Sequence, residues 1–328
     1  MRQDQLPMHV RPTFVLPRYK TVYVAVSKAA CTSLKWLVAD IQGEDPGRFR
    51  ASSRMVTRDM GIHMRGRWRR TPTLHSLPDR ELARIDATNG WFVFTVVRHP
   101  AARLFSAWQS KLLLREPKYA ERYGAAPWFP RIPRSTEDVV EDFGRFAAAI
   151  SADPKRGVMR DRHFMPQWVE AAPDRMPYSE VYDTAQIPAL LERLEAHLRA
   201  NGYEGELRLR RTNESPLAPI AALFTPEVRG ALERLYGDDY RHLGYESVEP
   251  PRLDPAGTYP DGAFDEIARL VERHERIGDL AALKDPEPAA AAAPADSRVR
   301  RLSQLPPGLV VARARRSAAI RLRRLRRG

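Results

Sequence analysis

The chain has 328 residues, of which 54 are Lys or Arg, 41 are Asp or Glu, and one, Cys31, is a cysteine. This length can bury one large core or two modest ones, and a single cysteine excludes an internal disulfide. Eleven of the 54 basic residues are arginines between Arg298 and Arg327, so the rest of the chain, with 43 basic and 41 acidic residues, is nearly neutral and is not expected to bind nucleic acid.

Residues 1–19 are predicted to be a polar lead-in, interrupted by Pro7, Pro12 and Pro17. The N-terminus lacks the apolar core of a signal peptide, and no run of the chain approaches the roughly 20 apolar residues of a membrane span. We therefore expect a cytoplasmic protein. The bias toward Arg, Ala and Pro is typical of a GC-rich bacterial genome.

A strand, a turn and a helix are predicted between residues 23 and 41. Tyr23–Val26 is short, apolar and β-branched, as in a buried strand of a parallel sheet. Small residues then let the backbone approach a ligand, and the start of the next helix offers free N–H groups and a positive dipole end to an anion. The residues expected to bind that anion are Ser27, Lys28, Ala29, Ala30, Cys31, Thr32 and Ser33.

This turn differs from the phosphate-binding loop of nucleoside triphosphatases. The pattern G-x-x-x-x-G-K-[ST] is absent, and no glycine occurs between Tyr23 and Ile41. A site that wraps a triphosphate is therefore not expected.

The region before the next strand has weaker signals. Residues 44–73 are rich in arginine and lack apolar periodicity, which favours surface loops or part of an acceptor cleft. A short helix is predicted from Glu81 to Ala87.

A second strand, turn and helix follow. Phe92–Val97 is a predicted buried strand, Arg98 stands at its carboxyl end, where open α/β sheets place ligands, and Pro100 suits the first turn of a helix. Arg98 can donate two parallel hydrogen bonds to phosphate oxygens, and Ser106 can donate one more. The alternative is that Arg98 caps the sheet edge and Ser106 only fills a helix position. The two strand–turn–helix segments, in this order, favour a site that binds two separate phosphates of one nucleotide.

The remaining pattern completes an α/β prediction: a P-loop-like parallel sheet flanked by helices, with irregular loop insertions and a basic C-terminal tail. Lys111–Thr136 is rich in proline and is expected to be a long irregular insertion. Helices are predicted at Ile187–Ala200, from Thr225 onward with Thr225 as N-cap and Pro226 at the first position, and at about Phe264–Leu280.

Four parts are predicted along the chain: the lead-in 1–19, a catalytic domain 20–249, a helix and Pro/Ala-rich linker 250–296, and an Arg-rich tail 297–328. In the tail, Arg315–Arg327 places Ile320, Leu322 and Leu325 among arginines. This pattern is consistent with a basic amphipathic helix at an anionic membrane surface, and equally with a disordered, solvated tail.

The two phosphate-binding segments resemble those of sulfotransferases that depend on 3′-phosphoadenosine-5′-phosphosulfate (PAPS). More narrowly, the chain is similar to the carbohydrate sulfotransferases that include the HNK-1, chondroitin and dermatan 4-O-sulfotransferases. Their first segment reads P-K-x-[AG]-[CS]-T-S, here with Ser27 in place of Pro, and their second contains R-x-P-x-x-R-L-x-S-A, here beginning at Arg98. Two weaker similarities are Asp161–Gln167, which resembles H-W-x-P-Q, and Tyr236–Tyr245, which resembles the end of the transferase domain.

The resemblance covers residues 20 to 247 and implies the roles of the site residues. Lys28 would meet the charge on the leaving oxygen and the sulfonate, while Thr32 and Ser33 would bind the 5′-phosphate. Arg98 and Ser106 would bind the 3′-phosphate, and Arg211 and Asn213 would contribute from a loop near the nucleotide. The family members of the animal Golgi have cysteines after the H-W-x-P-Q segment. This chain has none there, which is consistent with a protein made in a reducing compartment.

Transfer to a hydroxyl also needs a general base, and two histidines are candidates. His163 lies in the segment similar to H-W-x-P-Q, and His75 precedes the second strand, where an active-site loop is expected. For either, a structural role as a hydrogen-bonded histidine is the alternative. His99 directly follows Arg98 and is expected to point the other way. No His/Cys/Asp cluster has the spacing of metal ligands, so no metal is expected.

The resemblance implies an acceptor that is a carbohydrate, a glycolipid or another hydroxyl-bearing molecule. A nucleotide-dependent phosphotransferase that uses the same strand–loop–helix is the alternative enzyme, although no Mg²⁺-binding aspartate follows the second strand. A non-enzymatic module acting through the basic tail is the third possibility, and the presence of both Lys28 and Arg98 argues against it.

Overall fold

The structure, a computed structural model, describes residue 4, residue 6 and residues 12–51, 57–210 and 215–284. The chain divides into a first unit, Met1–Ala281, and a second, Ala282–Gly328. The first unit contains the whole sheet and is described below. The predicted linker after residue 284 and the Arg-rich tail lie outside the described residues.

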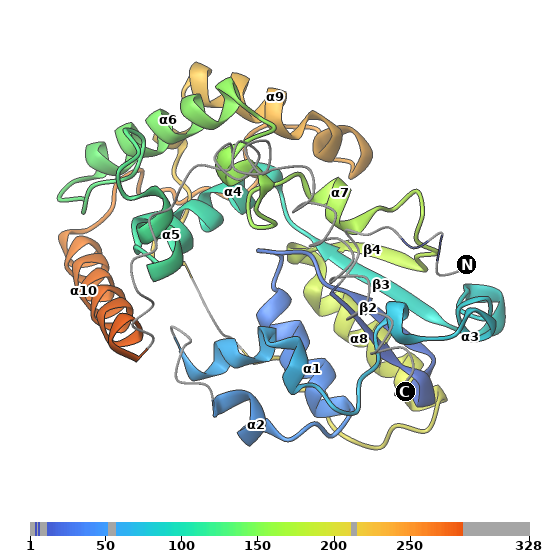
Figure 1. Cartoon of the computed structure of the whole chain (residues 1–328). Helices are drawn as coiled ribbons and strands as arrows, with labels where there is room; N and C mark the ends of the chain where they lie inside the picture. Colours follow the sequence, from blue (N-terminus) through green and yellow to red (C-terminus); the bar gives the residue numbers. More distant parts are fainter. Residues whose placement is uncertain (1–3, 5, 7–11, 52–56, 211–214, 285–328) are drawn as a thin grey trace, which may run out of the picture. The chain divides into compact units, whose positions relative to one another are not determined.

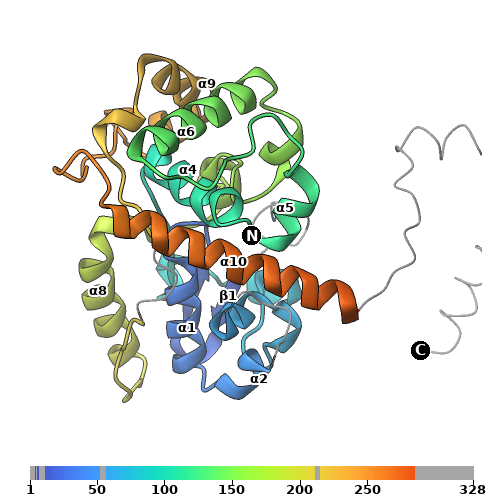
Figure 2. The same cartoon turned by 90° about the vertical axis from the view of Figure 1, so that its left-hand side faces the viewer.

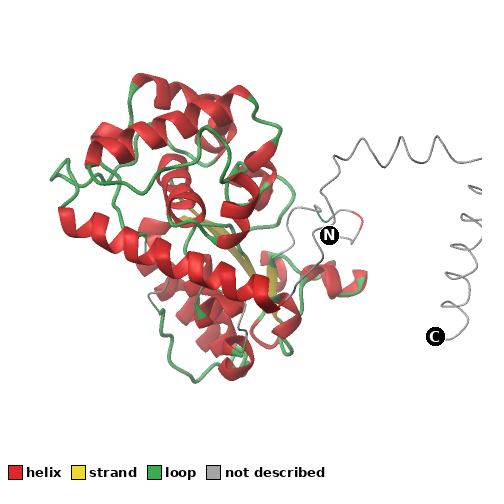
Figure 3. Ribbon diagram, turned by 60° about the vertical axis from the view of Figure 1, so that its left-hand side comes forward, coloured by secondary structure: helices red, strands yellow, loops and turns green. Residues whose placement is uncertain are grey.

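The centre of the first unit is a four-stranded sheet in the order β1-β2-β3-β4 (Figures 1 and 3). The strands are β1 (Thr13–Leu16), β2 (Thr21–Val24), β3 (Phe92–Val97) and β4 (Glu180–Asp183). β2 pairs with β3, and β3 with β4, in parallel, whereas β1 pairs with β2 antiparallel. The predicted parallel sheet is thus confirmed, with one antiparallel edge strand added.

Strand β1 lies in the segment that was expected to be a polar lead-in. All four of its residues are buried, and the connection to β2 is the short 3₁₀ turn Pro17–Tyr19. The predicted strand Tyr23–Val26 is present two residues earlier, as β2, whereas the predicted strand Phe92–Val97 has the bounds of β3.

Alternating side chains on the central strands give the sheet two apolar faces. Phe14, Tyr23 and Phe94 are paired in register across β1, β2 and β3, and their rings stack at centroid distances of 6.0 and 5.2 Å. Helices α1 (Cys31–Ile41) and α8 (Ile187–Ala200) pack on this aromatic face. Valines of the same strands face the other way, toward α3 (Asp79–Leu82). Burial on both faces explains the continuous apolar runs of β2 and β3.

A second apolar core lies among helices beyond the sheet. Its members come from α4 (Pro100–Trp108), α6 (Thr136–Ala152), α9 (Pro226–His242) and α10 (Asp261–Lys284). Trp108, Phe105 and Phe143 form its aromatic centre, with ring centroids 5.2 to 5.8 Å apart. Figure 2 shows α10 as a long helix across this side of the molecule, and Ile267 and Val271 from α10 are part of the core.

Several helix predictions are confirmed. Helix α8 has the predicted bounds Ile187–Ala200, and α9 starts as expected, with Thr225 accepting a hydrogen bond from the N–H of Val228 and Pro226 in the first turn. The helix expected at Glu81–Ala87 is instead α3 followed by a 3₁₀ turn at Ala87–Asn89. No helix in the described part of the chain is long and apolar enough to cross a membrane.

Two regions expected to be loops contain helical turns and buried side chains among their described residues. Residues 44–73 contain α2 (Pro46–Arg50), 3₁₀ turns and the buried side chains of Phe49, Ile62 and Trp68. The predicted insertion Lys111–Thr136 begins within a π-helix, Gln109–Leu113, and contains α5 (Pro117–Tyr123) and the buried Leu112, Leu113 and Tyr119. Single bulky side chains, not a helical repeat, anchor these segments, and periodicity does not reveal them.

Replacing Ile267 with alanine tests how α10 contributes to stability. The Ile267 side chain is 0% exposed, so Ile267→Ala should lower the free energy of unfolding by about 2–4 kcal/mol through lost burial and a cavity. Leu280→Ala on the same helix is the matched control, since Leu280 is 57% exposed and should change stability by less than about 0.5 kcal/mol. Urea unfolding measures both. Equal effects would show that α10 is not part of the cooperative core.

Candidate active site

The loop between β2 and α1 is held in a strained conformation without glycine. Lys28 and Ala30 have φ angles of 68° and 54°, in the left-handed region. This conformation costs a residue with a Cβ on the order of 1 kcal/mol or more. Such strain persists where the surrounding structure determines the backbone, and it gathers at ligand-binding turns.

The start of α1 is left available for an anion. Its N-cap, Ala30, has no side chain that can cap the helix, and the first turn contains no acidic residue. The first N–H groups of a helix have no partner within the helix, and its dipole favours negative charge there. Thr32 and Ser33 add hydroxyl groups in the same turn, as predicted.

At the end of β3, the backbone of Arg98 is fixed by one glutamine. The Arg98 N–H donates to Oε1 of Gln167 at 3.0 Å, and Nε2 of Gln167 donates to the Arg98 carbonyl at 2.6 Å. Gln167 is fully buried at the start of α7 (Gln167–Ala171). The amide therefore sets the position of Arg98 and leaves its guanidinium free to reach a ligand.

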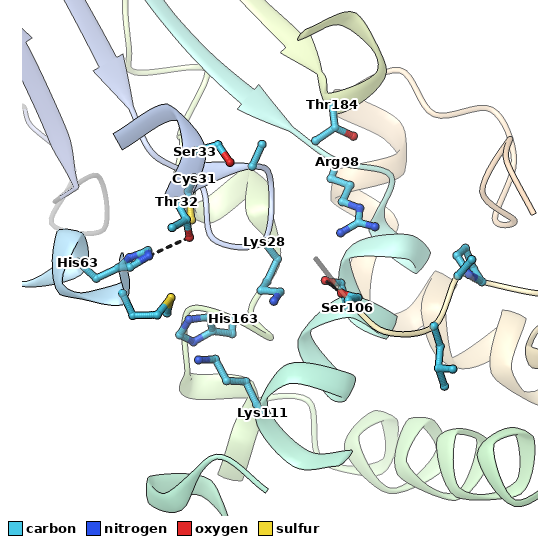
Figure 4. Close-up of a pocket in the computed structure, with 16 residues that line it drawn as sticks. Lys28, Cys31, Thr32, Ser33, His63, Arg98, Ser106, Lys111, His163 and Thr184 are labelled. Atoms are coloured by element: carbon cyan, nitrogen blue, oxygen red, sulfur yellow. Dashed lines mark hydrogen bonds between the residues drawn. The ribbon is translucent and has the colours of Figure 1, made fainter. Parts of the chain in front are cut away.

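A cavity of about 460 Å³ joins the two loops, and its lining includes Lys28, Thr32, Ser33, Arg98 and Ser106. Figure 4 shows Lys28 between Thr32 on one side and Arg98 with Ser106 on the other. Among the described residues, the guanidinium of Arg98 makes no hydrogen bond or ion pair, and burial lowers its pKa below the usual value. Cationic donors that form no ion pair with a described residue, placed at two ends of one cavity, are suited to a ligand with two anionic groups.

The π-helix after α4 contributes two further groups, of which Lys111 lines the cavity and Ser110 contacts Lys28. Ser110 accepts a hydrogen bond from Nζ of Lys28 at 2.9 Å, and Lys111 lines the cavity and pairs with Glu116. Burial, followed by repulsion from Lys111, lowers the pKa of Lys28 to about 7. The π-helix is a feature common at functional sites, and it turns Lys111 into the cavity.

His163 has the arrangement of an oriented base. Its Nδ1 lies 2.6 Å from Oδ1 of Asp161 and 3.1 Å from the hydroxyl of Tyr119, which donates to the other carboxylate oxygen. A carboxylate partner assigns the proton to Nδ1, so Nε2 is left as an acceptor. Burial lowers the pKa of His163 to about 4, against the opposing effect of Asp161, so the ring is neutral at pH 7.

His63 connects the first loop to a buried lysine. Its Nε2 lies 3.0 Å from Oγ1 of Thr32, and its Nδ1 lies 3.0 Å from Nζ of Lys35. A protonated Lys35 can only donate, which assigns the ring proton to Nε2 and makes Thr32 the acceptor. The hydroxyl hydrogen of Thr32 then remains for a ligand in the cavity.

One buried ion pair ties these segments together. The guanidinium of Arg103 donates to the carbonyls of Ser27, Met165 and Arg162 at 2.8, 2.7 and 2.9 Å, and lies 3.5 Å from Glu170. Glu170 accepts from both the N–H and the hydroxyl of Ser27 at 2.9 Å. Arg103 was part of the second segment in the sequence, and its role is now evident: it positions the first.

The later, weaker similarities have supporting roles. Asp239 accepts hydrogen bonds from the N–H groups of Gln167 and Trp168 at 3.0 and 2.7 Å and so caps α7, and burial raises its pKa to about 6. The Tyr236 hydroxyl donates to the carbonyl of Phe164 at 2.6 Å. Both residues hold the segment that carries His163 and Gln167.

The structure divides the predicted site residues into three groups. Lys28, Ala30, Cys31, Thr32, Ser33, Arg98, Ser106 and His163 line the cavity. Ser27, Ala29 and His75 do not. Ser27 hydrogen-bonds Glu170 and, like His75, lines a neighbouring cavity, and Ala29 is buried. Arg211 and Asn213 lie outside the described residues, but Ser215 from the same loop lines the cavity and hydrogen-bonds Ser106 at 2.8 Å.

His63, Ser110 and Lys111 were not identified from the sequence. Ser110 follows Ser106 by one helical turn, and that spacing was a usable signal. His99, as expected, points elsewhere: its Nε2 lies 2.9 Å from the carbonyl of Ser247. In the part of the chain that the structure describes, no three His, Cys, Asp or Glu side chains gather as a metal-binding group.

Comparison with known proteins gives one match. A family model described as "Sulfotransferase family" matches residues 11–246, from just before β1 to just beyond α9. No curated protein and no solved structure matches the chain.

The buried ion pair predicts a large effect of neutralising Glu170. Glu170→Gln leaves the guanidinium of Arg103 buried without its counter-charge, so the free energy of unfolding should fall by about 3 kcal/mol or more. The control is Glu195→Gln, which removes the exposed pair of Glu195 with Arg199 and should cost less than about 0.5 kcal/mol. Denaturant unfolding followed by circular dichroism distinguishes the two, and similar values for both variants would contradict the role given to Glu170.

Proposed function

Because the chain belongs to the sulfotransferase family, we propose that it transfers the sulfuryl group of PAPS to a hydroxyl of a carbohydrate or glycoconjugate. The observation that supports PAPS as donor is the cavity with Lys28 at the first loop and Arg98 at the second. Neither side chain forms an ion pair with any described residue.

The two ends of the cavity suit the two ends of this donor. At one end, the start of α1 with Thr32, Ser33 and Lys28 offers N–H groups, hydroxyls and a charge to the 5′-phosphosulfate. At the other end, the guanidinium of Arg98 offers paired N–H donors and Ser106 offers a hydroxyl to the 3′-phosphate. A nucleotide without a 3′-phosphate would lack the anion that Arg98 and Ser106 are placed to bind.

The transfer is an in-line displacement at sulfur. The acceptor oxygen forms a bond to sulfur while the bond between sulfur and the bridging oxygen of the 5′-phosphate breaks. The hydroxyl proton passes to Nε2 of His163, and adenosine 3′,5′-bisphosphate leaves with the electron pair of the broken bond. Lys28 meets the charge that develops on the leaving oxygen.

Electrostatics couples the base to the donor. In the free protein, burial and the positive charges of Lys111 and Lys28 hold the pKa of His163 near 4. A bound donor brings negative charge beside the same lysines and so raises that pKa. The base therefore becomes stronger once the donor is in place.

No feature of this site favours the alternative function, a nucleotide-dependent phosphotransferase. The cavity has cations at both ends and no glycine-rich loop, and the described residues show no carboxylate in its lining that would hold Mg²⁺.

The cytoplasmic location and the contact of residues 297–328 with a membrane surface stay predictions, and residues 297–328 lie outside the described residues.

The donor is tested by titrating adenosine 3′,5′-bisphosphate and ADP into the wild type and Arg98→Ala. Wild type should prefer the bisphosphate, and Arg98→Ala should weaken bisphosphate binding roughly 10- to 150-fold, as expected for the loss of charged hydrogen bonds of ~1.5–3 kcal/mol, with little change for ADP. Isothermal titration calorimetry gives the four dissociation constants.

Folding of the Arg98 variant is not expected to fail, because Gln167 holds the backbone of residue 98 rather than its side chain. Arg241→Ala is the control: this arginine is exposed and pairs with Asp238 within α9. Equal binding of ADP and the bisphosphate to the wild type would refute the donor assignment.

The general base is tested by comparing His163→Asn with His75→Asn. An asparagine amide at position 163 can still reach Asp161 from the place of Nδ1 but offers nothing at Nε2, so kcat should fall roughly 10²- to 10⁴-fold. Bisphosphate affinity should stay close to that of the wild type. His75 lies outside the donor cavity, so His75→Asn should retain most of kcat; the reverse result would make His75 the base.

A further inference from the structure

Lys111 is the third cation of the donor cavity, and the two phosphates of the donor do not account for it. The lining contains Lys28, Arg98 and Lys111 and, among its described residues, no aspartate or glutamate. Lys28 belongs to the loop proposed for the 5′-phosphate, and Arg98 follows β3, where the 3′-phosphate would bind. PAPS carries one more anionic group than adenosine 3′,5′-bisphosphate, namely the sulfonate that is transferred. Lys111 is the cation left for it.

The π-helix fixes where the Lys111 side chain points. The N–H of Leu114 donates to the carbonyl of Gln109, five residues earlier, at 2.9 Å, which is the hydrogen bond of a π turn. The side-chain amide of Gln109 donates to the carbonyl of Leu217 at 3.0 Å and accepts from its N–H at 2.9 Å. Nδ1 of His274 lies 2.5 Å from the Leu114 carbonyl. Both ends of the turn that carries Lys111 are thus anchored by other parts of the chain.

The amine of Lys111 is buried beside another cation. The residue is 5% exposed, and it forms an ion pair with Glu116, which does not line the cavity. Repulsion from Lys111 is the second cause, after burial, of the lowered pKa of Lys28. Lysines are seldom buried unless they are paired, and two that repel each other are stabilised by an anion that contacts both.

Lys111 also lies beside the candidate base. Its Nζ is 5.4 Å from the ring centroid of Tyr119, whose hydroxyl lies 2.8 Å from Oδ2 of Asp161 and 3.1 Å from Nδ1 of His163. Figure 4 shows the Lys111 side chain directed toward His163 and Lys28. In an in-line transfer, the hydroxyl lies between the base and sulfur, and the leaving oxygen lies beyond sulfur. A cation close to both the base and Lys28 is therefore close to the sulfonate.

We propose that Lys111 is a further catalytic residue, which binds the sulfonate of the donor. Its ammonium donates a charged hydrogen bond to a peripheral sulfonate oxygen and holds sulfur in line between the acceptor oxygen and the bridging oxygen. As the acceptor oxygen bonds to sulfur, its proton passes to His163, and the bridging oxygen leaves on the 5′-phosphate with the electron pair of the broken bond. The peripheral oxygens stay on sulfur, so Lys111 keeps its contact throughout.

This assignment rests on the proposed sulfuryl transfer, and its test compares two nucleotides that differ only in the sulfonate. PAPS and adenosine 3′,5′-bisphosphate are titrated by isothermal titration calorimetry, without acceptor, into the full-length wild type and Lys111→Met. Methionine keeps an unbranched side chain against Tyr119 and removes the charge. The ratio of the dissociation constant for PAPS to that for the bisphosphate should rise roughly tenfold or more, as expected for the loss of one charged hydrogen bond. The affinity for the bisphosphate should change much less.

Further variants separate contact with the ligand from a structural role. Glu116→Gln removes the carboxylate that pairs with Lys111 but keeps the lysine, so the ratio should stay close to that of the wild type. Lys118→Met is the matched control, because Lys118 lies 5.9 Å from the centroid of the same Tyr119 ring, is exposed and does not line the cavity. If Lys111→Met does not fold, the double variant with Glu116→Gln replaces it, since it leaves no carboxylate without its partner, and the same rise in the ratio is expected.

The outcomes separate the role of Lys111 from the identity of the donor. The role of Lys111 is overturned, and the donor stands, if the wild type prefers the bisphosphate to ADP but Lys111→Met leaves the ratio unchanged. It is also overturned if Glu116→Gln raises the ratio as much as Lys111→Met, because the ion pair would then be what matters. A wild type that binds ADP as tightly as the bisphosphate, or binds neither, would refute the donor and with it the role of Lys111.

Discussion

The buried ion pair of Arg103 and Glu170 is the interaction on which the site depends. Both side chains are almost completely removed from solvent, with exposed fractions of 1% and 0%, and together they bind the backbone on either side of the first loop and of the His163 segment. Removing one partner would leave an uncompensated charge in the interior. The loop after β2 and the segment that carries His163 are thus positioned by one electrostatic arrangement and not by two independent ones.

Local signals predicted most of the residues that line the proposed donor cavity. The two strands, the helices that follow them and the charges Lys28 and Arg98 were predicted from runs of apolar residues followed by polar ones, because a strand–turn–helix is encoded over about 15 consecutive residues. Their convergence in one cavity also follows from a parallel sheet, whose strand ends share an edge.

Residues that act over a long sequence separation were not predictable in this way. His63 reaches Thr32 across 31 residues, from a 3₁₀ segment that has no apolar period, and Lys111 enters the cavity because a π-helix shifts the register after α4. Ser27 matched a motif position but hydrogen-bonds Glu170, 143 residues away, and lines a neighbouring cavity rather than the one that contains Lys28 and Arg98. A motif states which residue types occur, whereas tertiary contacts decide which of them face a ligand.

Helix α10 shows that the folding unit extends beyond the region of sequence similarity. The family match ends at residue 246, yet Phe264, Ile267 and Val271 complete the helical core, and His274 hydrogen-bonds the carbonyl of Leu114 at 2.5 Å, next to the turn that carries Lys111. A chain cut at residue 246 would expose these core positions to water and release the support behind the π-helix. The smallest fragment able to fold as described here therefore extends through α10, well beyond the recognisable motifs.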